Sequence, residues 1–139
     1  MVVRVRLRVK RGNKVVELIA VANSGYEAST PQLLVPKNVA RDLGLWPPPP
    51  EAMELVYDTA GGPLRVWCIP RAVNVAVVTP DYVSNEVVAD LVISPFADEA
   101  LMSDTLIEAL GIVIEAAGSG LWRFRWEPKE KLRPSEKKS

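Results

Sequence analysis

The sequence predicts a mostly β domain with two short helices, and two patterns carry this prediction. From Val3 to Lys10, valine or leucine alternates with arginine or lysine, which is typical of a strand with one buried face and one wet face. Further apolar segments of strand length follow along the chain, separated by turn residues such as those at 11–13 and 59–63. The chain has 139 residues, enough for one domain with a sizeable core.

The first third of the chain is predicted to form a hairpin and a short helix. Turn residues 11–13 separate the first strand from a second one at 14–22, so the chain opens with a β-hairpin. A short apolar segment at 33–35 precedes a short helix at 36–44. That helix opens with a proline, which suits the first turn, and closes with a glycine, which suits the stop.

The rest of the domain is predicted to be mostly strands around a second helix. Strands are expected at 53–58, 64–78 and 86–94, and the last of these is nearly all apolar and therefore central. Residues 95–111 have helical spacing, with Ser103 as a plausible N-cap and Gly111 as a plausible stop. A last hairpin at 112–126 closes the fold.

The end of the chain differs in composition from the rest. Residues 127–139 contain one apolar residue, Leu132, among charged residues and prolines, so we expect a disordered charged tail. The folded domain is therefore predicted to span residues 1–126.

The composition argues against several classes of function. Lys and Arg total 17 and balance 17 Asp and Glu, so no net charge attracts nucleic acid or an anionic membrane. There is no histidine, and Cys68 is the single cysteine. The usual general base, a disulfide and a Cys-x-x-Cys metal site are thus missing, and we expect no metal and no cofactor. In its apolar context Cys68 is interpreted as a small buried hydrophobe.

The basic side chains of the first strand form a stripe on its wet face: Arg4, Arg6, Arg8 and Lys10. Such a stripe could bind phosphate groups. No aromatic residue interleaves it, so a solvated outer face is the favoured interpretation and no nucleic-acid partner is expected.

The sequence also predicts where the protein resides. No apolar run approaches the roughly 18 residues of a membrane helix. The N-terminus alternates charged and apolar residues and so lacks the continuous apolar segment of a signal peptide. We therefore expect a soluble, cytoplasmic protein with no membrane partner. Twelve prolines, a single glutamine and abundant valine also indicate a heat-adapted source.

One loop follows its strand abruptly. In "LIAVANSGY" (residues 18–26) an apolar strand ends in Asn23, Ser24 and Gly25. This segment resembles the active-site loop of the retropepsin-like aspartic peptidases, in which Asp-Thr/Ser-Gly follows an apolar strand.

The resemblance extends over residues 2–126. In that family the loop is followed by a segment like "LLVPKNVARDLGL" (33–45) and a flap hairpin like "VYDTAGGPLRV" (56–66). An apolar strand, a helix and a leucine-glycine-isoleucine step close the fold, and "ADLVIS…LIEALGIVIEAAGSGLWRF" is similar, with Ser94 where glycine is usual. The resemblance implies a closed retropepsin-like (acid-protease) β-barrel. It also implies a substrate-binding flap at Thr59, Ala60 and Gly61.

The resemblance further implies a homodimer. In the family two aspartates, one from each half of a symmetric pair, share one proton, so that one acts as base on a water and the other as acid. One chain of this length carries one such loop, which places the site on a twofold axis. The other candidate string, at residues 58–61, follows too soon to begin a second lobe and matches the flap turn.

Asn23 departs from the family pattern, because an amide cannot take a proton from water at neutral pH. The sequence as written therefore predicts an impaired or inactive peptidase whose cleft at the dimer axis binds a peptide or an unfolded-protein segment. Asn23 is either natural, an engineered replacement or a residue that deamidates slowly. Tyr26 is expected either near the cleft or packed under the loop.

In an alternative interpretation, the resemblance of this loop to the active-site loop of the family is incidental. Asn23, Ser24 and Gly25 all favour turns, and the protein would then be a non-enzymatic β-barrel with an interaction or structural role. The oligomeric state discriminates between the two, because the peptidase-like interpretation needs a symmetric dimer.

Overall fold

A computed structural model describes residues 2–59 and 61–138. The strands are β1 (Arg4–Arg11), β2 (Lys14–Val21), β3 (Gln32–Val35), β4 (Met53–Thr59), β5 (Gly62–Val77), β6 (Val87–Ile93), β7 (Ala100–Met102), β8 (Ile112–Ala116), β9 (Leu121–Phe124) and β10 (Arg133–Pro134). The helices are α1 (Lys37–Asp42) and α2 (Asp104–Ala109). The described chain is thus mostly β with two short helices, as the sequence predicts.

Six strands of the described chain form a closed barrel, in the order β1-β2-β7-β3-β6-β5. The ring closes where β1 pairs antiparallel with β5, with Leu7 opposite Val77. The pairs β2–β7 and β3–β6 are parallel, and β6 lies between β3 and β5, the central position predicted for it. Closure removes the unpaired strand edges that an open sheet would expose. The closed β-barrel is confirmed.

The core of the barrel is built from alternate residues of the strands. Val5, Leu7 and Val9 of β1 are fully buried, while the arginines between them stay outside. Each such side chain stabilises the fold by about 1.5–3 kcal/mol when fully buried. Leu106 of α2 and Phe124 of β9 join the same core, which fastens the helix and the last hairpin to the barrel.

The basic stripe on the outer face of β1 is paired with carboxylates. The ion pairs are Arg4–Glu99, Arg6–Glu136, Arg8–Glu17 and Lys10–Glu86, at 2.7–3.3 Å. Because each charge already has a carboxylate partner, this pairing supports the interpretation of the stripe as a solvated outer face.

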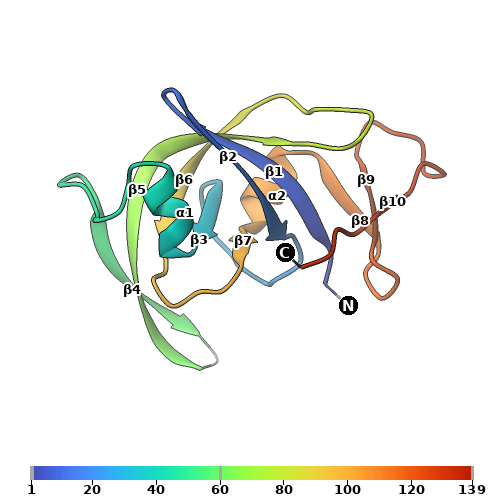
Figure 1. Cartoon of the computed structure of the whole chain (residues 1–139). Coiled ribbons are helices and arrows are strands. Elements are labelled where there is room, and N and C mark those ends of the chain that lie inside the picture. Colours follow the sequence, from blue (N-terminus) through green and yellow to red (C-terminus); the bar gives the residue numbers. More distant parts are fainter. Residues whose placement is uncertain (1, 60, 139) are drawn as a thin grey trace.

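β4 and the first half of β5 leave the barrel as a hairpin. The two strands pair from Met53 opposite Cys68 to Thr59 opposite Gly62, and the hairpin projects from the barrel at the lower left of Figure 1. β5 pairs with β6 on both sides of a register shift between Ile69 and Val73, and after the shift its second half also pairs with β1.

The second helix is shorter than the sequence predicts. Helical spacing was expected over residues 95–111, but α2 begins after Ser103, and residues 100–102 form β7. Ala100 and Met102 are buried and pair with β2 and β3, so barrel pairing overrides the apparent helical spacing. Ser103 is the N-cap as predicted, and Gly111 follows the helix with φ 75°.

Replacing Ser103 with alanine is expected to cost about 2 kcal/mol of unfolding free energy. The buried hydroxyl oxygen accepts from the Gln32 N–H at 2.9 Å and from the Leu106 N–H at 3.2 Å, so its loss leaves both donors unsatisfied. Urea denaturation measures the change. Ser119→Ala in an exposed turn is the control, and equal stability of the two variants would contradict the expectation.

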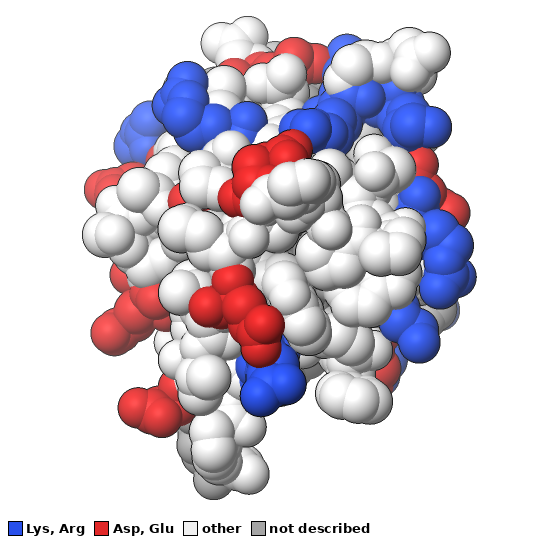
Figure 2. All heavy atoms as spheres, turned by 90° about the vertical axis from the view of Figure 1, so that its left-hand side faces the viewer, with Lys and Arg blue, Asp and Glu red and all other residues white. Residues whose placement is uncertain are grey.

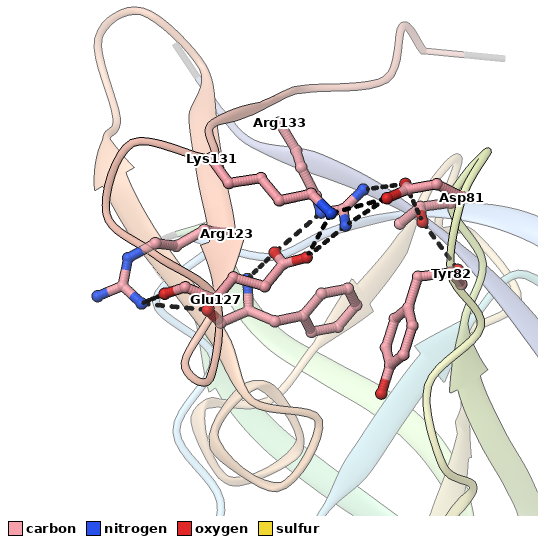
Figure 3. A network of polar contacts seen from close by, with 8 residues as sticks. Asp81, Tyr82, Arg123, Glu127, Lys131 and Arg133 are labelled. Atoms are coloured by element: carbon pink, nitrogen blue, oxygen red, sulfur yellow. Dashed lines mark hydrogen bonds and ion pairs between the residues drawn. The ribbon is translucent and has the colours of Figure 1, made fainter.

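The structure differs from the sequence prediction at residues 127–138, which we name the C-terminal segment. Instead of a disordered tail, these residues lie along the barrel, and β10 pairs with β9. Arg133 is 8% exposed and lies between Glu127 and Asp81, as Figure 3 shows. One guanidinium nitrogen donates to Glu127 Oε2 at 2.5 Å and another to Asp81 Oδ1 at 2.7 Å. The contact between Arg133 and Asp81 spans 52 positions of the sequence, and composition does not reveal it.

The C-terminal segment also reaches the start of β1. The Arg4 N–H donates to Ser135 Oγ at 2.8 Å, and the Glu136 N–H donates to the Arg4 carbonyl at 2.8 Å. The start of β1 and the C-terminal segment therefore lie side by side (Figure 1).

Neither helix of the described residues has the length and apolar character needed to cross a membrane.

Candidate functional site

The loop after β2, which begins at Ala22, is hydrogen-bonded to Val3 near the start of the chain. The Ala22 N–H donates to the Val3 carbonyl at 2.8 Å, and Asn23 Oδ1 accepts from the Val3 N–H at 2.7 Å. The side chain of Asn23 thus satisfies a backbone donor of a fully buried residue. This is a structural role that an aspartate oxygen fills equally well.

The next two residues reach the surface. Ser24 and Gly25 are both exposed, and Gly25 has φ 80°, in the left-handed region that favours glycine. The backbone conformation of the loop therefore explains the glycine without reference to catalysis.

Replacing Asn23 with alanine is expected to destabilise the protein by about 1–2 kcal/mol, because the Val3 N–H loses its acceptor. Asn23→Asp keeps the oxygen and is expected to remain close to the parent. Thermal and urea denaturation of both variants measure the difference. Equal stability of the alanine and aspartate variants would show that the hydrogen bond to Val3 contributes nothing.

A cleft of about 740 Å³ lies between this loop and the β4–β5 hairpin. Its volume lies within the range of about 300–1,000 Å³ that small-ligand sites occupy. The lining residues are Ser24, Gly25, Tyr26 and Glu27 of the loop, Leu34 of β3, Val56, Tyr57, Asp58 and Leu64 of the hairpin, and Leu101 of β7. The described lining thus combines apolar side chains with two tyrosines and two carboxylates.

The two tyrosines are joined through one glutamine. The hydroxyls of Tyr26 and Tyr57 donate to the same Gln32 oxygen, at 2.5 Å and 3.3 Å, and the ring centroids are 6.5 Å apart. The Gln32 amide nitrogen in turn donates to Thr30 Oγ1 at 3.2 Å and to Asp90 Oδ2 at 3.4 Å. Gln32 therefore connects the loop, the barrel and the hairpin.

Burial raises the pKa of Tyr26 well above its usual range, and it also raises the pKa of Tyr57. Both hydroxyls therefore stay protonated at physiological pH and act as donors. The tyrosines are therefore neutral walls of the cleft at that pH.

The structure brings most of the sequence-predicted site residues to one region. Ser24, Gly25 and Tyr26 line the cleft, and Asn23 lies just before them. Tyr26 is half-buried, so it both lines the cleft and packs under the loop. Thr59 ends β4 and Gly61 is exposed at the end of the hairpin, whereas Ala60 lies outside the described residues.

Sequence reasoning did not identify the role of Gln32 or of Tyr57. Gln32 is the one glutamine of the chain and opens a buried strand, which is an unusual position for a polar side chain. That signal points to Gln32 but does not reveal its partner, because Tyr57 lies 25 residues further along.

The site offers few groups for acid–base or metal chemistry. The carboxylates in the lining are Glu27 and Asp58, and the sequence has no histidine. No group of three or more metal-ligating side chains occurs among the described residues. Cys68 is buried in an apolar cluster with Leu34, and burial raises the pKa of its thiol.

Comparison of the chain with protein-family models and with curated proteins finds no match.

Proposed function

We propose that this protein is a retropepsin-like β-barrel that binds an extended peptide or unfolded-protein segment and is impaired or inactive as a peptidase. The observation that carries the proposal is the position of the cleft. It lies between the two segments, the Asn23 loop and the β4–β5 hairpin, that the family resemblance assigns to the active-site loop and the flap.

The lining of the cleft suits a peptide. Leu34, Leu64 and Leu101 supply apolar contacts, and Tyr26 and Tyr57 supply aromatic ones. Among the described residues, β4 pairs with β5 alone, so its other edge is open to an added peptide strand. Figure 2 shows this hairpin protruding at the lower end of the molecule.

The charge of the lining favours a basic or neutral peptide. Glu27 and Asp58 are the charged members of the described lining, and both are acidic. Arg65, on the hairpin, is paired with Glu54 at 2.9 Å. A peptide with Lys or Arg side chains is therefore the better probe for binding.

The chemistry of the loop explains why binding is proposed without cleavage. A retropepsin-like mechanism needs a carboxylate that takes a proton from water, and the amide of Asn23 cannot do this. Its oxygen is moreover occupied by the Val3 N–H. No imidazole is present in the chain to act as a substitute base.

The proposal includes a symmetric homodimer. One chain carries one loop of this kind, so a complete two-loop site needs a second copy. Ser24 and Gly25 are exposed in the single chain and are accessible to the same residues of a partner.

A second candidate is a non-enzymatic barrel with an interaction or structural role. The hydrogen bond between Asn23 and Val3 favours it, because that bond explains the loop as a structural turn. This candidate requires neither a dimer nor an occupied cleft.

Peptidase assays of the parent chain and of Asn23→Asp, at mildly acidic to neutral pH, test the catalytic part. We expect the parent not to cleave a broad peptide library. Cleavage by Asn23→Asp alone, blocked by an aspartic-peptidase inhibitor, would show that the amide silences a competent site. Cleavage by the parent at a similar rate would overturn the proposal of an impaired peptidase.

Analytical ultracentrifugation of the parent tests the dimer. A concentration-dependent dimer is the expected result. A monomer at every concentration favours the second candidate.

A further inference from the structure

A second hollow, of about 640 Å³, lies away from the cleft, beside the turn between β1 and β2. Its described lining holds four basic residues and no acidic one. The lining residues are Lys10, Arg11, Gly12, Lys14, Leu43, Gly44, Arg71, Ala72, Val73, Asn74 and Val88. We name this region the basic hollow. Figure 2 shows Lys and Arg side chains gathered toward the top of the molecule, where Figure 1 places that turn.

Two of the four basic residues form no ion pair with a carboxylate of the described chain. Lys10 pairs with Glu86 at 2.7 Å, and Arg11 approaches Glu51 at 3.9 Å. Among the described residues, no carboxylate lies within ion-pair distance of Lys14 or Arg71. This differs from the stripe on β1, where each basic side chain is paired.

The backbone holds these charges together. Lys14 is opposite Arg11 in the β1–β2 hairpin, and Lys10 is opposite Asn74 of β5. An Arg11 guanidinium nitrogen donates to the Ala72 carbonyl at 2.9 Å, which fixes that side chain against β5.

Arg71 occupies a special backbone position. It lies at the bulge of β5 with φ 51°, the one positive φ of a non-glycine residue in the described chain. Its N–H donates to Asp90 Oδ1 at 2.8 Å, which holds the bulge in place. The bulge thus keeps Arg71, which lines the hollow, in a backbone conformation that is unfavourable for most residues other than glycine.

We propose that the basic hollow binds a compact anion that carries two or more phosphate groups. Lys14 and Arg71 lie beside Lys10 and Arg11 without forming an ion pair of their own in the described chain, and a bound polyanion reduces the repulsion among these like charges. Arginine and lysine side chains are the usual phosphate ligands, and the Asn74 amide adds a further donor.

The lining favours a compact anion over a nucleic-acid strand. No aromatic residue occurs among the described lining residues, so the hollow has no side chain on which a base can stack. The two basic residues of the lining without an ion pair, Lys14 and Arg71, also line one hollow together instead of following a groove.

Inorganic triphosphate is the probe that tests the proposal. We expect it to raise the melting temperature of the parent by more than sodium chloride of equal ionic strength, and to bind measurably by calorimetry. No difference from chloride would overturn the proposal.

A double variant tests whether the hollow is the site. Lys14→Gln with Arg71→Asn removes the two unpaired charges, and asparagine tolerates positive φ. We expect affinity for triphosphate to fall at least about tenfold. Lys129→Gln with Lys137→Gln removes the same charge from exposed positions of the C-terminal segment and is expected to bind like the parent.

Two outcomes would contradict this assignment. An equal loss of affinity in the two double variants would show non-specific attraction to net charge. Tighter binding of a single-stranded oligonucleotide than of triphosphate, carried by the same residues, would replace the compact anion with a nucleic acid.

Discussion

Replacing Arg133 with alanine is expected to lower the free energy of unfolding by about 3 kcal/mol. The guanidinium is 8% exposed and donates to both Glu127 and Asp81. It also lies over the rings of Trp122 and Phe124, at 5.8 Å and 5.4 Å from their centroids. Removing it leaves the largely buried Glu127 carboxylate with only the more distant Lys131 ammonium, at 3.3 Å, among its ion-pair partners in the described chain, and the loss of the closer partner is the main cost.

Urea denaturation of Arg133→Ala, Arg133→Lys and Lys129→Ala measures this effect. Lysine keeps the charge but lacks the planar fork that reaches two carboxylates at once, so an intermediate loss is expected. Lys129 is exposed in the same segment and is the control. If Arg133→Ala were as stable as Lys129→Ala, the C-terminal segment would be the disordered tail that its composition predicts.

Acid is expected to destabilise the protein between about pH 4.5 and pH 2, with Glu127 as a principal group. Hydrogen bonds from Arg133, helped by the Phe124 N–H and Lys131, lower the pKa of Glu127 from 4.5 to about 2. Because the folded pKa lies below the unfolded one, this stabilisation is complete above about pH 4.5. It is lost as the pH falls through the folded value. Arg133 and Lys131 also lower the pKa of Asp81, which acts in the same direction.

Melting temperatures measured across this range for the parent and for Glu127→Gln check the prediction. The variant is expected to melt lower at neutral pH, and the gap is expected to close as the pH falls toward 2. Glu130→Gln, at an exposed position of the same segment, is expected to follow the parent throughout. A constant gap between Glu127→Gln and the parent would show that Glu127 does not carry the acid sensitivity.

The elements that were predicted correctly are determined by residues close to one another in the sequence. The first hairpin follows from alternation along residues 2–10 and from turn residues at 11–13, both of which are visible within a few positions. The end of α2 follows from Gly111 in the same way. β7 was missed because three residues give too little pattern, and its pairing partners lie far away in the sequence.

The C-terminal segment shows the limit of composition as evidence. Its high content of charged residues predicts disorder. In the structure, however, Arg133 donates hydrogen bonds to Glu127, six positions away, and to Asp81, 52 positions away. The residue that orders the segment is therefore recognisable only when the fold brings the three groups together.

The candidate site was predictable in part. The loop of Asn23, Ser24 and Gly25 stands out because an apolar strand ends there abruptly. The opposite wall of the cleft depends on how β4 and β5 fold back, so the contact of Tyr57 with Gln32 has no local sign.

The most direct test of the peptide-binding proposal is to follow the backbone amide resonances of the parent during titration with an extended basic peptide. We expect the shifts to concentrate at residues 24–27 of the loop and 56–58 and 64 of the hairpin. Shifts confined to other surfaces, or none at peptide concentrations that saturate ordinary peptide-binding domains, would contradict the assignment of the cleft as the binding site.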